Sequence, residues 1–275
     1  MNTIDLSINT DLARLILTQF LREEITRTGL SRAVVGLSGG IDSALACCLA
    51  AEALGPQNVL AVRMPYRTSA QESLDHAQLV IDQLGVPSLT IPITEMAEPL
   101  LARFPEMSNL RRGNIMARAR MVVLYDQSAA FGGLVVGTGN KTEIMLGYST
   151  LYGDSAHALN PLGDLYKTQV RQLAQALNVP VPIQTKAPSA DLWPGQTDEG
   201  EMGLTYAHAD QLLYLLVDQR YKPEECVAAG FDEPFVRLVV DRLRRNHFKR
   251  VMPLVAKLSN RTVGYDFLYL RDWGT

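Results

Sequence analysis

Apolar residues along the chain fall into two alternating patterns, short continuous runs and longer stretches with helical spacing. The continuous runs are typical of buried strands, and the spaced stretches are typical of amphipathic helices. Because the two alternate, we predict βαβ units and an α/β fold: a doubly wound parallel sheet flanked by helices, with a helical C-terminal region. The predicted strands are residues 34–37, 58–64, 88–93 and 134–137.

Capping and breaking residues place the ends of the predicted helices. Asp11 is a fair N-cap and Gly29 a fair stop for the first helix, while Ser69 and Glu72 form the pattern of a capping box. Apolar residues at helical spacing in the first helix predict that one face of it packs on the protein. The predicted helices are residues 11–29, 44–54, 69–85, 114–131, 167–177, 206–217, 223–229 and 233–246.

Two stretches lack a clear period. Prolines, glycines and acidic residues are frequent between Pro180 and Gly203, which is typical of a lid or binding loop. The tail, residues 253–275, is expected to dock on the body of the protein or on a second subunit. We therefore expect one domain over residues 1–275, with a sheet core at about 30–180, a mobile loop at about 181–204 and a helical region with its tail at 205–275.

The composition is that of an ordinary globular protein, and it disfavours several functions. A net charge of −3 argues against nucleic-acid binding, and no apolar run reaches the ~18 residues of a membrane span. The first residues do not form a signal peptide, so we expect a cytoplasmic location. Cys47, Cys48 and Cys226 show neither a disulfide framework nor a zinc-binding spacing, and we interpret them as core residues.

The first predicted strand ends in a turn with the chemistry of an anion site, Ser-Gly-Gly-Ile-Asp-Ser at residues 38–43. A helix that starts here has unpaired amide groups and roughly half a positive charge at its first turn. Gly39 and Gly40 let the backbone approach a phosphate closely, and the serine hydroxyls add donors. A carboxylate beside a phosphate needs a cation between them, so Asp42 is a candidate Mg²⁺ ligand. The alternative is a glycine-rich turn without a ligand.

Further candidates follow the other strands, at the same edge of the predicted sheet. Thr138 follows the fourth strand, and Glu143 is a candidate second carboxylate for the cation at Asp42. Residues 64–68 follow the second strand and form either part of an adenine pocket or only a loop. Lys167 opens a helix, where its charge opposes the helix dipole, so it either holds an anion against the amides or is solvated.

The turn at residues 38–43 differs from a Walker A loop, which has a Lys after its glycines. It is similar to the signature of the PP-loop, or N-type, ATP pyrophosphatases, which cleave ATP between the α- and β-phosphates and leave AMP on an acceptor oxygen. With its other motifs in order, nearly the full chain resembles the ammonia-dependent NAD⁺ synthetases. The resemblance rests on residues 36–43, 114–121, 137–143, 152–154, 165–167, 186–192, 198–203 and 249–250.

The resemblance implies a Rossmann-like fold of the adenine nucleotide alpha hydrolase type and a ligase that completes NAD biosynthesis. ATP and Mg²⁺ adenylylate the nicotinate carboxylate of deamido-NAD⁺ with release of pyrophosphate, and ammonia then attacks the acyl adenylate to give NAD⁺ and AMP. The resemblance also implies a homodimer. No glutaminase segment precedes the first predicted helix, so we expect ammonia to come free or from another chain.

Roles for individual residues also follow from the resemblance. The expected ATP-binding residues are Gly36, Leu37, Ser38, Gly39, Gly40, Ile41, Asp42, Ser43, Thr138, Lys167 and Ser189. The residues expected to contact deamido-NAD⁺, some of them across the dimer interface, are Arg118, Tyr125, Asp154 and Lys249. Asp42 and Glu143 would bind Mg²⁺, and the expected catalytic residues are Asp42, Lys167 and Asp154.

Arg118 and Arg120 stand two positions apart on a predicted helix, so at most one of them is expected to point into a shared pocket. Three positions depart from the family pattern: Leu151 and Ala158 stand where better-known members have Lys and Asp, and Phe248 stands where His is frequent. These departures concern the nicotinate mononucleotide half of the substrate.

Two other functions remain open at this stage. One is a different PP-loop adenylating ligase that acts on a nucleotide, an amino acid or tRNA, although a tRNA-modifying enzyme would carry basic stripes that this acidic chain lacks. The other is a nucleotide-binding subunit without turnover. Such a subunit would not need Asp42, Glu143 and Lys167 together, so their joint presence favours an enzyme.

Overall fold

The computed structural model describes residues 4–189, 193 and 195–267. Within this part of the chain, parallel strands form one sheet in the order β3-β2-β1-β4. β1 is central, with Val34 opposite Leu60 of β2 and Val135 of β4. The predicted parallel α/β sheet is therefore confirmed. The strands are β1 (Ala33–Gly36), β2 (Val59–Arg63), β3 (Ser88–Thr90) and β4 (Leu134–Val136).

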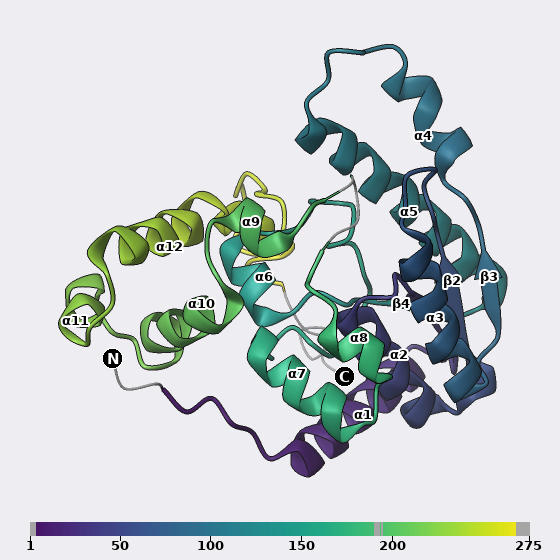
Figure 1. Ribbon diagram of the computed structural model, residues 1–275, viewed down its shortest axis with the longest axis horizontal. Helices are drawn as coiled ribbons and strands as arrows, with labels where there is room; N and C mark the ends of the chain where they lie inside the picture. Colours follow the sequence, from purple (N-terminus) through teal and green to yellow (C-terminus); the bar gives the residue numbers. More distant parts are fainter. Residues whose placement is uncertain (1–3, 190–192, 194, 268–275) are drawn as a thin grey trace.

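Helices cover both faces of the sheet (Figure 1). Successive strand residues point to opposite faces, so Ala33 and Val35 pack into one apolar core while Val34 packs into another. The first core holds α1 (Thr10–Arg27), α2 (Ile41–Leu54), α3 (Gln71–Leu84), α7 (Lys167–Ala176) and α8 (Val181–Thr185). The second core holds α4 (Thr94–Leu101) and α5 (Asn109–Phe131).

A helical region with its own apolar core lies to one side of the sheet (Figure 1). Its sequence alternates buried apolar and exposed polar positions at helical spacing, as predicted for residues 206–246. Helix α10 continues into a π-helical turn, so the predicted helix 206–217 is confirmed with a change of type near its end. The elements are α6 (Lys141–Leu146), α9 (Asp198–Met202), α10 (Tyr206–Leu213), the turn η2 (Tyr214–Asp218), α11 (Pro223–Ala228) and α12 (Glu233–Arg245).

Two predicted helix caps are wrong. Asn9 caps α1, accepting a hydrogen bond from the Leu12 amide, and Asp11 lies in the first turn. Helix α3 begins at Gln71 without a side-chain cap, because the Ser69 hydroxyl accepts the Tyr66 amide in the preceding turn instead. Short polar side chains serve turns and caps equally well, so a capping pattern alone does not fix the start of a helix.

Three other boundaries differ from the prediction. Helix α5 begins five residues earlier than expected, at Asn109, because Ser108 caps it. Helix α4 was not predicted, since Pro99 lies inside it and reads as a helix breaker. The stretch from Pro180 to Gly203, predicted to be irregular, contains the short helices α8 and α9, and its residues 190–192 and 194 lie outside the described part of the chain.

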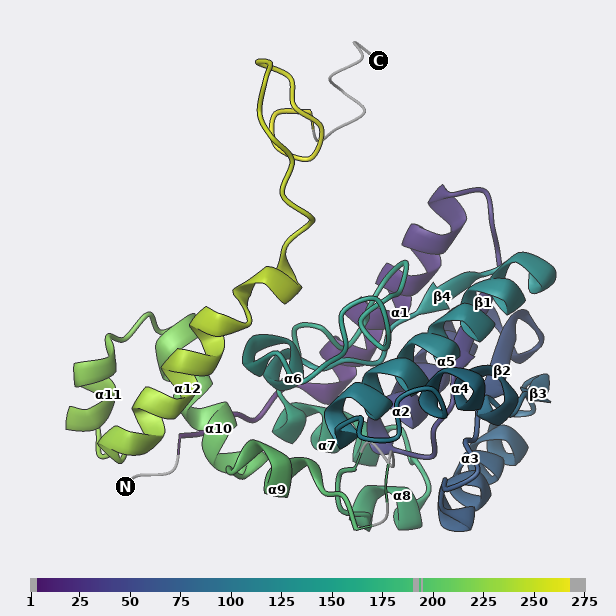
Figure 2. The same cartoon turned by 90° about the horizontal axis from the view of Figure 1, so that it is seen from above.

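Apolar surface is exposed near both ends of the chain. Leu21 and Ile25 of α1 are buried as predicted, and Ala13 and Leu17 pack against the same core. Leu12, Leu15 and Ile16 are more than half exposed, so they lie on an open face of the helix. After α12 the chain forms a short 3-10 turn, η3 (His247–Arg250), and beyond it leaves the body as an extended segment (Figure 2). The described part of the tail does not dock on the body, since Leu254 and Leu258 are almost fully exposed. No helix among the described residues is long and apolar enough to span a bilayer.

Candidate active site

The glycine turn between β1 and α2 is shaped for close backbone approach. Gly39 has a φ of +81°, and a Cβ atom there would lie 2.1 Å from the Ser73 carbonyl oxygen of α3. Gly40 is the N-cap of α2 and offers no side chain to the free amides of that helix. The hydroxyls of Ser38 and Ser43 lie 3.1 Å apart, and Ser43 also donates to the Gly40 carbonyl, so the serines hold the shape of the turn. The first amides of α2 therefore remain available to an anion.

Lys167 lies at the centre of a charged cluster built from distant segments. Its Nζ lies 2.5 Å from Asp42 Oδ2 and 3.4 Å from Glu143 Oε1. Asn140 completes the cluster by donating to Asp42 Oδ1 at 2.9 Å and by forming a capping box with Glu143. The anion predicted against Lys167 is thus a pair of carboxylates in this structure. Asn140 was not predicted as a site residue, although Asn followed three residues later by Glu is a capping-box signal.

The surroundings shift the ionisation of these groups. Burial lowers the pKa of Lys167, but the attraction of Asp42 and Glu143 outweighs burial, so the net pKa of this ammonium is raised. Burial raises the pKa of Glu143, and the nearby Lys167 opposes that shift. A fully buried ammonium of this kind needs carboxylate partners to stay charged. The cluster is therefore a site that keeps a positive charge beside two acidic groups.

Two tyrosines and a third acidic residue surround the cluster. The Tyr206 hydroxyl lies 3.2 Å from both Glu143 Oε1 and Asp198 Oδ2. The Tyr148 hydroxyl lies 3.1 Å from Asp198 Oδ1 and 2.5 Å from Glu201 Oε2. Burial raises the pKa of Asp198, an effect that Lys167 opposes. These residues were missed as site residues, because their role depends on how α9 and α10 pack against α6.

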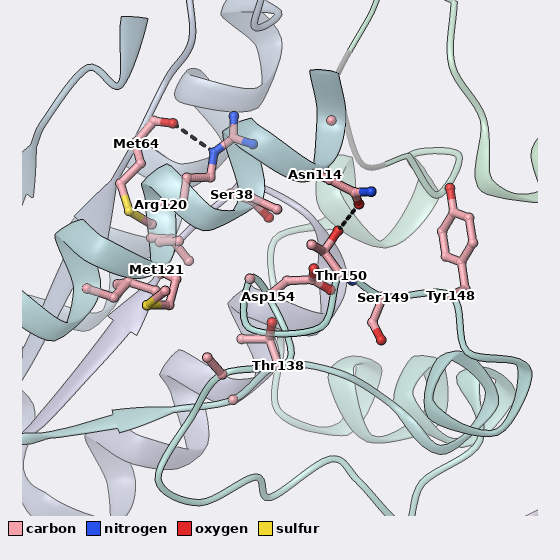
Figure 3. Close-up of a pocket in the computed structure, with 18 of the residues that line it drawn as sticks. Ser38, Met64, Asn114, Arg120, Met121, Thr138, Tyr148, Ser149, Thr150 and Asp154 are labelled. Atoms are coloured by element: carbon pink, nitrogen blue, oxygen red, sulfur yellow. Dashed lines mark hydrogen bonds between the residues drawn. The ribbon is translucent and has the colours of Figure 1, made fainter. Parts of the chain in front are cut away.

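A cavity of about 490 Å³ opens beyond the carboxyl ends of β1, β2 and β4 (Figure 3). Ligands bind at this edge in open parallel sheets. Arg120 borders the cavity and donates to the Met64 carbonyl, and Thr150 donates to the Asn114 side chain. The residues that the sequence placed here and that line the cavity are Gly36, Leu37, Ser38, Met64, Pro65, Thr138, Asp154 and Lys249.

A smaller cavity of about 200 Å³ adjoins the first and contains the charged cluster. Ser38, Thr138 and Asp154 line both cavities. The smaller cavity is lined by Gly40, Ile41, Asp42, Ser43, Glu143, Lys167, Ser189 and Asp198 among others. Two connected spaces, one larger and one charged, fit a nucleotide whose phosphates lie against the glycine turn.

The residues expected to contact a second nucleotide are only partly brought together. Asp154 accepts the Thr150 amide, and Lys249 donates to the carbonyls of Gly147 and Ser149 at 2.7 Å each, so these two organise the wall of the larger cavity. Arg118 and Tyr125 are exposed and line neither cavity; Arg118 donates to the Leu151 carbonyl.

The expectation that at most one of two neighbouring arginines faces a shared pocket agrees with the structure. Arg120 lines the larger cavity, whereas Arg118 does not. The loop at residues 64–68 divides in the same way, since Met64 and Pro65 line the cavity while Tyr66 packs into the core and Arg67 pairs with Glu98.

Among the described residues, no group of three or more His, Cys, Asp or Glu side chains is arranged to hold a metal ion. Asp42 and Glu143 face the same small cavity as a pair, with Lys167 between them. Mg²⁺ prefers one or two carboxylates together with phosphate oxygens, so this pair suits a magnesium ion delivered with a nucleotide.

Comparison with known proteins identifies the family. The chain matches the family model of NAD synthase over residues 15–253. It is 58% identical to the NH(3)-dependent NAD(+) synthetase of Trichlorobacter lovleyi over 269 residues, which are 98% of either chain. Its structure resembles that of NMN synthetase from Francisella tularensis with a TM-score of 0.81, at 32% identity over 92% of this chain and 100% of that one.

A second solved structure is similar to the same extent. The NH3-dependent NAD synthetase from Campylobacter jejuni, determined in complex with the nitrate ion, gives a TM-score of 0.78 at 31% identity, over 91% of this chain and all of that one. These similarities and the parallel sheet agree with the expected adenine nucleotide alpha hydrolase-like fold. Family model, relatives and geometry lead to one conclusion: the chain belongs to the NAD synthase family.

Proposed function

We propose that this protein is a ligase that amidates deamido-NAD⁺ with ammonia at the expense of ATP. A nicotinate carboxylate oxygen attacks the α-phosphorus, the bond to the β-phosphate oxygen breaks, and pyrophosphate leaves. Ammonia then attacks the carbonyl carbon of the acyl adenylate, AMP leaves with the carboxylate oxygen, and the nitrogen loses a proton. The products are NAD⁺, AMP and pyrophosphate.

The observation that carries this proposal is the meeting of Lys167, Asp42 and the α2 amides in one small cavity. Backbone amides and an ammonium are the groups that hold phosphate oxygens. Lys167 already lies beside the glycine turn, so its charge is preorganised for the triphosphate and for the pyrophosphate that leaves. Turnover then depends on orienting two nucleotides, without a covalent intermediate on the enzyme.

Asp42 and Glu143 are the residues that would hold Mg²⁺, since both face the small cavity. When bound there, the ion would neutralise phosphate charge. Lys167 keeps the two carboxylates together in the structure described here, which fixes their spacing. Thr138 and Ser189 both line the small cavity and would contact ATP there, and Asp154 would lie between the two nucleotides because it lines both cavities.

A homodimer completes the proposed substrate site. Arg118, Val122 and Tyr125 stand at helical spacing on α5, and all three are exposed outside the cavities. Contacts from Arg118 and Tyr125 to deamido-NAD⁺ therefore require the substrate of a second copy. We expect Val122→Glu to yield monomers in sedimentation velocity and to lower turnover; fully active monomers would contradict the shared site.

We place the reaction in the cytoplasm, where ATP and Mg²⁺ are supplied.

The substrate is tested by supplying the purified protein with ATP, Mg²⁺ and ammonium, together with deamido-NAD⁺ or nicotinate mononucleotide. We expect NAD⁺ from the first, with kcat/KM at least about tenfold above that for the mononucleotide. The second arm is needed because one structural relative is an NMN synthetase, although the chain is much more similar to a named NAD(+) synthetase. Preference for the mononucleotide would replace the proposed substrate, and no amidation of either would refute the proposed reaction.

A further inference from the structure

Helix α10 reaches the charged cluster with two residues one turn apart. The Tyr206 hydroxyl lies 3.2 Å from Glu143 Oε1, and Asp210 Oδ1 accepts the hydroxyl of Thr142 at 2.5 Å. Thr142 and Glu143 are consecutive on α6, so α10 binds two neighbouring residues of that helix. The helical region therefore touches the site through α10, although neither cavity is lined by Asp210.

Asp210 links this helix to the start of α7 as well. Its second oxygen, Oδ2, accepts the Thr168 amide at 2.8 Å. The Lys167 amide donates in turn to the Thr142 hydroxyl at 3.1 Å. Asp210 and Thr142 have no exposed surface, and Lys167 is 2% exposed. The buried Asp210 carboxylate thus satisfies the first two amides of α7. It accepts the Thr168 amide directly, and it binds the Thr142 hydroxyl that accepts the Lys167 amide.

Asp210 offsets an unfavourable charge at the start of α7. Helix α7 begins with Lys167 and has no acidic residue in its first turn, so an ammonium stands where the helix dipole is positive. The first amides of a helix also need acceptors when they are buried. Asp210 supplies the missing negative charge from another helix, and it does so without occupying either cavity.

We propose that Asp210 is a positioning residue for Lys167, acting through Thr142 and the first amides of α7 to fix the ammonium opposite Asp42 and Glu143. The inference rests on the proposed function, because it concerns the group that would hold the ATP phosphates. In each of the neighbouring pairs Thr142-Glu143 and Lys167-Thr168, one residue belongs to the charged cluster while the other binds Asp210. Loss of this carboxylate would move the ammonium while leaving the cavity walls in place.

The test uses two variants that remove the link and two that do not. Asp210→Asn keeps the shape but removes the charge and one acceptor, and Thr142→Val removes the hydroxyl. Thr142→Ser keeps the hydroxyl. Asp218→Asn is the matched control, since Asp218 also joins the helical region to the starts of α6 and α7, through Lys141 and the Tyr166 hydroxyl, but has no bond to the Lys167 amide, Thr142 or Thr168.

We expect Asp210→Asn and Thr142→Val to lower kcat about tenfold or more, with KM for deamido-NAD⁺ within about twofold of the wild type, as for other residues that orient a reacting group. Thr142→Ser and Asp218→Asn are expected to stay within about threefold of the wild-type kcat. Thr142→Val keeps the test available if Asp210→Asn does not fold. Wild-type kcat in a folded Thr142→Val, or an equal loss in Asp218→Asn, would overturn the proposal.

Crystal structures of the wild type and Thr142→Val, without nucleotide, separate this inference from the proposed function. The separation of Lys167 Nζ and Asp42 Oδ2, 2.5 Å here, should exceed hydrogen-bond distance in the variant. An unmoved ammonium would refute the positioning role even if the enzyme makes NAD⁺. If the ammonium is displaced in Thr142→Val while the wild-type protein makes no NAD⁺, the positioning role stands and only the proposed function is refuted.

Discussion

The side chains of Lys167 and Asp42 form a largely buried ion pair between residues that are 125 positions apart in the chain. Asp42 comes from the first turn of α2 and Lys167 from the first turn of α7, so two helices present opposite charges at one point. Such a pair is costly to desolvate, and it keeps its value only while both partners are present. We therefore take this ion pair as the position of the charges that would bind the ATP phosphates and Mg²⁺.

Removing either partner should abolish most of the activity. We expect Lys167→Met or Asp42→Asn to lower kcat by about a hundredfold or more, because a preorganised charge at the phosphates is lost. Lys167→Met should also lower the free energy of unfolding by about 3 kcal/mol, since two carboxylates are left without their cation. The double variant should be less destabilised than the sum of the single ones. Steady-state kinetics and urea denaturation measure both effects, and near-normal turnover in either single variant would contradict the assigned roles.

Glu143→Gln tests the magnesium assignment. The amide can still accept a hydrogen bond from the Asn140 amide, but it is a poor metal ligand, so the Mg²⁺ concentration for half-maximal rate should rise about tenfold. Titration of Mg²⁺ at saturating ATP measures this shift. Glu24→Gln, which changes an exposed carboxylate paired with Arg27, serves as the control and should leave the titration unchanged. An unshifted midpoint for Glu143→Gln would remove Glu143 from the metal site.

Gly39→Ala and Gly29→Ala separate strain from collision. Both glycines have a φ of +81°, but a Cβ at Gly29 would meet no atom within 4 Å, whereas one at Gly39 would overlap the Ser73 carbonyl. Gly29→Ala should cost about 1 kcal/mol of stability for the left-handed conformation alone. Gly39→Ala should cost more and should raise KM for ATP, because α3 or the turn must move. Equal losses of stability with unchanged KM would show that the turn tolerates the collision.

The thiols of Cys47 and Cys48 should be almost inert in the native protein. Burial raises the pKa of Cys47 to about 12 and that of Cys48 to about 11. Only the thiolate reacts, and a raised pKa leaves little thiolate at pH 8. Labelling of the two cysteines by Ellman's reagent should therefore be about a hundredfold slower in the folded protein than in urea. Raising the pH toward 11 should speed labelling of the folded protein. A Cys226→Ala background restricts the signal to the two neighbours, and fast native labelling would contradict their burial.

Local sequence was sufficient for the elements whose signals are local. The turn between β1 and α2, the start of α7 at Lys167 and the three helices after Tyr206 were all predicted, because glycine turns and helical periodicity are short-range patterns. Helix α4 and the caps at Asn9 and Ala70 were not, because a proline or a short polar side chain has several compatible roles.

Only part of the site could be predicted for a related reason. Residues in motifs at the ends of strands, such as Asp42 and Thr138, were placed correctly at the sheet edge. Asn140, Tyr206 and Asp210 were missed, since their polar atoms gain a function only after α6 and α10 have packed together. Arg118 and Tyr125 are exposed outside both cavities, so a substrate contact for them would need the second copy proposed above.

Adenylylation of the nicotinate carboxylate by ATP transfers one carboxylate oxygen to AMP, and labelled oxygen follows that transfer. Deamido-NAD⁺ with ¹⁸O at both carboxylate oxygens is incubated with the protein, ATP, Mg²⁺ and ammonium, and the masses of the separated products are measured by mass spectrometry. We predict one ¹⁸O atom in AMP for each NAD⁺ formed, and none in pyrophosphate. Label in inorganic phosphate with formation of ADP, or NAD⁺ formed without labelled AMP, would contradict adenylylation of the carboxylate.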